Sequence, residues 1–171
     1  MSLKRILFII FISLISLNVN SSENISFVDI DFLFENSTLG KSISKKLNNL
    51  NTKNIDYLKL KENKLVLQEN EISKIKNVIS KDELEKKISA FKKEIQLFDS
   101  EKKNIINDFN KKKTSELEFF FKKINPIIQA FMNENSVDIL MDKKNIFIGK
   151  STHDITNNIL SIINEKIIIN E

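Results

Sequence analysis

The sequence contains no cysteine and only one proline, two glycines and one histidine in 171 residues. The absence of cysteine excludes disulfide bonds and thiol catalysis, and it makes an oxidising compartment harmless to the chain. The scarcity of glycine and proline argues against a turn-rich β fold and against an α/β fold with many short connections. The composition therefore favours long helices, and the length of the chain corresponds to one domain.

The residues also give little basis for catalysis or metal binding. His153 is the only histidine, and no nucleophile or orienting group accompanies it at a convergent spacing. Two groups of carboxylates occur, Asp29 with Asp31 and Asp82 with Glu83 and Glu85. Without histidine, cysteine or a calcium-loop pattern, they fit strand-end turns and a helix start better than a metal site. No glycine-rich phosphate loop is present, so we expect no enzyme activity, no cofactor, no metal and no nucleotide hydrolysis.

Residues 1–21 have the pattern of a cleavable signal peptide. Lys4 and Arg5 form a basic start, residues 6–17 are apolar or serine-spaced, and residues 19–21 suit a cleavage site before Ser22. The alternative is an uncleaved membrane anchor, which needs about 20 apolar residues, whereas this run stops at Asn18. We therefore expect export and a mature chain with 25 lysines and 23 acidic residues, which is less basic than the net charge of +4 suggests.

Apolar residues recur at helical spacing over residues 39–79. The stripe consists of Ile43, Leu47, Leu50, Leu58, Leu65, Ile72 and Ile79, the last four at intervals of seven. This period predicts one narrow seam that faces a partner helix, as in a coiled coil. Asn54, Lys61 and Gln68 interrupt the seam and should loosen it. A helix of this length would extend roughly 60 Å, so we expect it to protrude from the domain.

A second long helix is predicted to begin after Ser80. Ser80 and Glu83 form a capping box, and Ile79 and Leu84 have the spacing of a hydrophobic staple. Its apolar stripe runs over residues 84–131, and the reversal at residues 77–80 makes the two helices antiparallel. Pro126 lies inside this stripe, where it should kink or end the helix.

The two ends of the chain contain short β-like segments. Residues 25–30 are typical of a strand, and residues 137–141 with 145–149 are typical of a hairpin across residues 142–144. Asp154 or Thr156 can cap a short last helix. We therefore predict a mostly α protein with a small β body. Residues 22–56 and 121–171 form the body and arm roots, and residues 57–120 form a helical hairpin arm inserted between strands one and two.

The charge and the aromatic residues of the arm allow more than one interpretation. Residues 57–120 hold 15 lysines and 12 acidic residues, which fit a solvated helix face and, less directly, attraction of acidic chains or anionic lipid. Nucleic-acid binding is not expected, because arginine forks and interleaved stacking aromatics are missing. Phe119, Phe120 and Phe121 cover three faces of one helix, so at least one ring should be exposed unless another chain covers it. These rings can pack at the arm root or can line a surface for a client.

The order of these features resembles the Skp (OmpH-like) family of periplasmic chaperones of outer-membrane proteins. The resemblance rests on the signal peptide, Phe27-Val28-Asp29, Leu33-Phe34-Glu35, Gly40-Lys41, the lysine-rich helices, residues 137–144 and Asp154-Ile155-Thr156. It implies a homotrimer whose strands associate into a central barrel and whose helical hairpins enclose a cavity for unfolded clients. The implied trimer body includes Phe27, Val28, Ile139, Leu140, Ile146 and Phe147.

On this basis we expect an ATP-independent holdase in the periplasm, with unfolded outer-membrane proteins as partners and anionic lipid as a further contact. The apolar residues assigned to client binding are Leu58, Leu65, Phe91, Phe98, Phe109, Phe119 and Phe121. The alternative from a different class is a structural coiled-coil spacer or adaptor of the cell envelope. Suppression of client aggregation would distinguish the two, because a spacer has no reason to suppress it.

Overall fold

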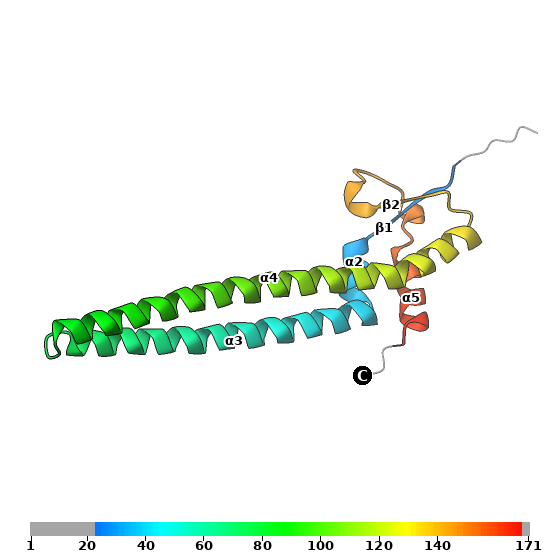
Figure 1. The fold of residues 1–171 in the computed structure, drawn as a ribbon. Helices are drawn as coiled ribbons and strands as arrows, with labels where there is room; N and C mark the ends of the chain where they lie inside the picture. The colour runs from blue at the N-terminus through cyan, green and yellow to red at the C-terminus, as the bar shows by residue number, and fades with distance from the viewer. Residues whose placement is uncertain (1–22, 169–171) are drawn as a thin grey trace, which may run out of the picture.

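The protein consists of a small body and a long helical arm that projects from it (Figure 1). The computed structural model describes residues 23–168, so the expected signal peptide lies outside the described residues. The elements follow the order β1 (Ile25–Val28), α2 (Ile30–Asn36), α3 (Thr38–Ile75), α4 (Lys81–Glu134), β2 (Ile139–Asp142), two short 3-10 turns (Lys143–Asn145 and Ser151–His153) and α5 (Thr156–Lys166). No helix within residues 23–168 is long and apolar enough to cross a membrane.

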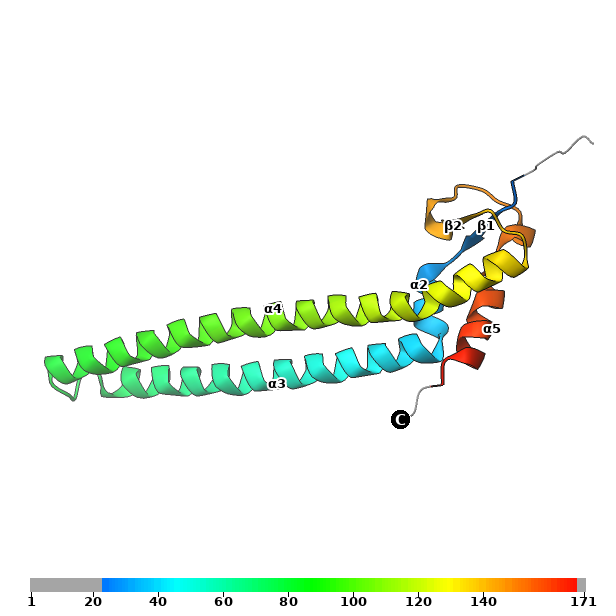
Figure 2. The ribbon, with the colours of Figure 1, turned by 45° about the vertical axis from the view of Figure 1, so that its right-hand side comes forward.

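The arm is an antiparallel pair formed by α3 and α4, which lie side by side in both views (Figures 1 and 2). At 1.5 Å per residue, the 38 residues of α3 extend about 57 Å. Ser37 caps α3 by accepting a hydrogen bond from the amide of Gly40. The predicted cap of α4 is confirmed, because the Ser80 hydroxyl accepts from the amide of Glu83 at 3.4 Å. The Glu83 carboxylate, however, receives its bond from the Ser80 hydroxyl and not from the Ser80 amide.

Pro126 does not end α4, which continues to Glu134. A proline in a helix interior removes one backbone hydrogen bond, but tertiary packing can outweigh that loss. Ile124 and Ile128 lie on either side of Pro126 and are buried in the core. Figure 2 shows that α4 changes direction close to the body.

The sheet has two parallel strands that come from opposite ends of the sequence. Ile25 pairs with Ile139 and Val28 pairs with Asp142, so the whole arm is inserted between β1 and β2. The predicted hairpin is wrong. After β2 the chain forms a 3-10 turn in which Asp142 accepts from the amide of Lys144, and residues 146–150 form no strand. The strand beside β2 is therefore β1, from the other end of the sequence, and not the segment that follows β2.

The predicted first strand is shorter than expected, because Asp29 leaves the sheet and caps α2. Its carboxylate accepts from the amide of Phe32 at 2.9 Å. Helix α2 was not predicted. It packs Leu33 into the core, where the ring of Phe34 meets the buried ring of Phe120 edge to face with centroids 5.0 Å apart.

The body core lies where α2, the base of α3, the end of α4 and α5 meet. It contains Val28, Leu33, Leu39, Ile43, Phe120, Ile124, Ile128, Ile155, Ile159 and Ile163. Gly40 allows α3 to approach α2 at this point. A Cβ at Gly40 would lie 2.6 Å from the carbonyl carbon of Phe34 and closer still to its oxygen.

Candidate functional site: the arm and the open body surface

The seam between α3 and α4 holds the predicted apolar stripe together with its polar interruptions. Asn54 and Gln68 are half-buried in it, as the sequence suggested, whereas Lys61 reaches out to a carboxylate on α4. The side-chain oxygen Oε1 of Gln68 is buried without a hydrogen-bond partner within the described residues. It lines a cleft of about 200 Å³ near the arm tip, together with Ile72, Ala90 and Phe91. Packing of the seam is therefore incomplete toward the tip.

A polar contact crosses the middle of the arm. The Tyr57 hydroxyl donates to one oxygen of Glu101, and Lys61 Nζ lies 3.2 Å from the other. The hydrogen bond from Tyr57, followed by that from Lys61, lowers the pKa of Glu101 below its ordinary value. The Glu101 carboxylate thus joins the two helices at this level through Tyr57 and Lys61 of α3.

A second polar contact lies at the root of the arm. Glu116 is buried, and its Oε1 atom accepts from Lys46 of α3 at 2.6 Å and from Lys112 of α4 at 2.9 Å. The hydrogen bonds from Lys46 and then from Lys112 lower the pKa of the Glu116 carboxyl, and they outweigh the opposing effect of burial. One buried carboxylate thus joins both arm helices where they enter the body.

The residues assigned to client binding fall into two groups. Five of them are half-buried along the seam, namely Leu58, Leu65, Phe91, Phe98 and Phe109. Phe119 and Phe121 lie at the arm root and are 43% and 40% exposed, while Phe120 between them is fully buried. This confirms that the three rings cannot all be covered within one chain.

Sequence reasoning missed the most exposed leucines of the arm. Leu60, Leu67 and Leu97 are 71%, 63% and 69% exposed, and they lie off the seam. The sequence pattern could have revealed them, because these leucines lie on the charged face of each helix and do not follow the spacing of the apolar stripe. An exposed group of large apolar side chains on a charged rod indicates a surface for a partner.

The body presents apolar residues around its open sheet. Among the residues assigned to the body, Phe27 and Val28 are buried, Leu140 and Ile146 are half-buried, and Ile139 and Phe147 are exposed. Phe147 and Ile148 are almost completely exposed, and Ile25 and Met141 are exposed on the strands. These side chains surround a two-stranded sheet, which is too small to be a stable unit by itself.

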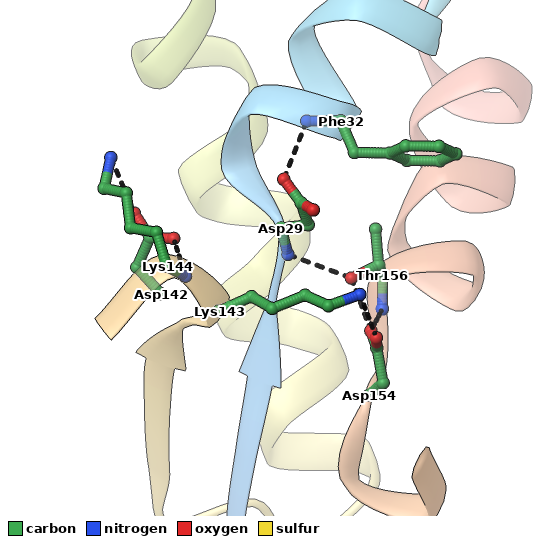
Figure 3. Close-up of polar contacts among 7 residues, drawn as sticks. All are labelled: Asp29, Phe32, Asp142, Lys143, Lys144, Asp154 and Thr156. Atoms are coloured by element: carbon green, nitrogen blue, oxygen red, sulfur yellow. Dashed lines mark hydrogen bonds and ion pairs between the residues drawn. The ribbon is translucent and has the colours of Figure 1, made fainter. Parts of the chain in front are cut away.

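A set of polar contacts joins the sheet to α5 (Figure 3). It includes Asp29, Asp154 and Thr156, which are among the residues on which the family resemblance rests. Asp154 was expected as a possible cap, and its carboxylate accepts from the amide and hydroxyl of Thr156 and from Lys143 Nζ. The Thr156 hydroxyl in turn accepts from the amide of Asp29 at 2.9 Å. Burial would raise the pKa of Asp154, but the hydrogen bonds from Lys143 and Thr156 lower it overall. Neither Asp154 nor Thr156 is the N-cap residue of α5, which is Ile155.

The remaining polar candidates have structural positions. His153 is exposed at the end of a 3-10 turn. Asp29 caps α2, and Asp82 and Glu83 lie in the first turn of α4, where negative charge favours the helix. Within residues 23–168, no group of three or more metal-ligating side chains converges.

Comparison with known proteins identifies a family that shares this architecture. A family model described as outer membrane protein (OmpH-like) matches residues 24–163. A crystal structure from Caulobacter crescentus CB15, described as an OmpH-like candidate outer membrane chaperone, has the same fold. Its TM-score is 0.77 and its sequence identity 14%, over 84% of this chain and 85% of that chain. No curated protein matches the sequence. Because the family model covers most of the chain, the protein belongs to the OmpH-like (Skp) family of periplasmic, non-enzymatic chaperones of outer-membrane proteins.

Proposed function

We propose that the protein is a periplasmic, ATP-independent holdase that binds unfolded outer-membrane proteins between helical arms and prevents their aggregation. The observation that carries the proposal is the arm, which extends about 57 Å and displays leucines that are mostly exposed. Membership of the chaperone family supports the same reading. Release without nucleotide hydrolysis fits many weak contacts, each of which can be lost separately.

We further propose that three chains assemble through the body. The support is the pair of strands with an open edge, surrounded by exposed Ile139, Met141, Phe147 and Ile148. Unpaired strand edges and apolar patches of this kind favour association with other chains. Three copies of the body would project their arms from the same side of the assembly, so that the arms enclose a common cavity in which several of them contact one client.

The test is to remove the arm while keeping its root. Lys46 contacts Glu116 and Tyr57 contacts Glu101, so residues 53 and 107 lie at about the same level of the hairpin. Deleting residues 54–106 and joining the ends by a short Gly-Ser turn keeps the Glu116 contact and the core. The shortened protein should remain a trimer by light scattering and should lose suppression of aggregation of an unfolded β-barrel client. Full suppression by the shortened protein would place the client site on the body and would contradict the proposal.

A further inference from the structure

One flank of the arm forms a continuous surface along α3. Consider the residue that comes immediately before each seam position of α3. These residues form a single stripe, because they repeat at the same three- and four-residue spacing as the seam. The stripe includes Lys46, Lys53, Tyr57, Leu60, Lys64 and Leu67. We call the side of the hairpin that carries this stripe the trough face.

Three clefts between α3 and α4 open on the trough face. The root cleft is lined by Lys46 and Lys53, the middle cleft by Lys64, and the tip cleft by Glu71, which continues the stripe. The bond between Tyr57 and Glu101 crosses the same face between the root and middle clefts. The clefts therefore follow one another along one face of the hairpin, and we call this row of clefts the trough.

The middle of the trough is apolar. The middle cleft is lined by the exposed Leu97 and by the half-buried seam residues Leu65 and Phe98. Leu60 and Leu67 lie one helical turn on either side of Lys64, which lines the same cleft. Three exposed leucines from both helices thus surround one section of the trough, alternating with charged side chains.

The root end of the trough is basic. Lys45, Lys46, Lys53 and Lys112 line the root cleft, and the single carboxylate Glu116 accepts from only two of them. Within residues 23–168, neither Lys45 nor Lys53 takes part in an ion pair. This excess of positive charge favours acidic groups on whatever lies in the trough.

The length of the trough fits an extended polypeptide. The root cleft, at about 440 Å³, has the size of a small-molecule pocket, whereas the middle and tip clefts, at about 150 and 200 Å³, fall below the roughly 300 Å³ of such a pocket. From Lys46 to Leu67 the trough extends about 32 Å at 1.5 Å per residue. That distance corresponds to about ten residues of extended chain, the length of one membrane-spanning strand. Such strands place their apolar side chains on one face, and that face fits the section of the trough that carries Leu60, Leu67 and Leu97.

We propose that the trough face is the part of the arm that holds an extended strand segment of the unfolded client. Leu60, Leu67 and Leu97 contact its apolar side chains, and the root lysines contact its acidic ones. The inference rests on the proposed holdase function. It adds that this face of each arm turns toward the client and that the opposite face does not.

The test compares two triple variants of the full-length mature protein. The first is L60Q/L67Q/L97Q on the trough face. The matched control, I55Q/V66Q/I106Q, removes three half-exposed apolar residues from positions that follow the seam by one, on the opposite face. Glutamine keeps helix propensity close to that of leucine, and circular dichroism should show unchanged helicity in both variants.

The trough variant should need about tenfold more protein for half-maximal suppression of client aggregation, and the control should stay within about twofold of the wild type. Equal losses in both variants, or no loss in the trough variant, would overturn the inference while leaving the holdase function intact. Failure of the wild type itself to suppress aggregation would instead refute the proposed function.

The basic end is tested separately with K45Q/K53Q. This variant should bind a peptide of an acidic client strand about threefold more weakly at low salt, and the difference should shrink as salt screens the charges. Vesicles with anionic lipid serve as the competing ligand. Loss of vesicle binding with unchanged peptide binding would assign the lysines to lipid and would overturn the basic half of the proposal.

Discussion

Replacing Gly40 by alanine should destabilise the protein, although the same change normally stabilises a helix. Within a helix, alanine is favoured over glycine by about 1 kcal/mol. At this position, however, the new Cβ would lie 2.6 Å from the carbonyl carbon of Phe34. Ordinary van der Waals contact begins near 3.4 Å, so α2 must move by at least about 0.8 Å relative to α3. The Phe34 carbonyl belongs to the backbone, so it cannot relieve the clash by a change of rotamer as a side chain could.

The expected cost follows from what the movement disturbs. Helix α2 carries Leu33 into the core, and Phe34 packs edge to face on Phe120. Overpacking of a well-packed core costs about 1–3 kcal/mol, and a backbone clash lies at the upper end of that range. After the gain in helix propensity, we expect a net loss of about 2 kcal/mol, or roughly 4–8 °C in Tm for a domain of this size.

The assay is thermal unfolding of G40A and the wild type at the same protein concentration, followed by circular dichroism. N48A is the matched control, because Asn48 is exposed on the same helix and its replacement should be neutral or slightly stabilising. If G40A melts at or above the wild-type temperature, the close approach of α2 and α3 is not what requires glycine, and the reasoning is refuted.

Two further predictions concern the arm. Glu116→Gln should cost about 1–2 kcal/mol at neutral pH, because it removes the charge that Lys46 and Lys112 share. The pKa of Glu116 is lowered on folding, so its contribution is complete above about pH 4.5 and is lost as the pH falls through the folded-state value. Denaturant titrations should show the two proteins converging at low pH, and a constant gap would contradict this assignment. Amide hydrogen exchange should be faster over residues 58–109 than in β1, because the arm side chains are mostly exposed and the seam is interrupted. Equal protection would mean that the polar seam positions do not weaken the arm.

The sequence predicted the arm well because helices are specified by nearby residues. The seven-residue stripe and the Ser80 cap placed both helices within a few residues of their bounds. The body was harder to predict, because its contacts join residues far apart in the sequence. Residues 145–149 have the composition of a strand but pair with no strand among the described residues, and α2 is a seven-residue helix whose cap, Asp29, also fits a strand end.

The same limit applies to the candidate site. The seam residues could be found from their period, and the exposure of a ring within Phe119–121 could be argued from the geometry of one helix. The trough face could not, because its clefts combine residues from α3 and α4 that only the pairing register brings together. Leu97 in particular becomes part of a surface only through its position opposite Lys64.

The parallel pairing of β1 with β2 also constrains how the chain reaches its native state. Asn24 and Asp138, which bond at the start of the two strands, are separated by 114 residues. Closing so long a loop directly would be entropically costly and slow. The α3–α4 hairpin, in contrast, grows from a local turn at residues 76–80, and each added turn of helix brings the two ends closer. We therefore expect the hairpin to form before the sheet, so that changes that delay pairing of the arm helices should slow formation of the sheet without altering its final structure.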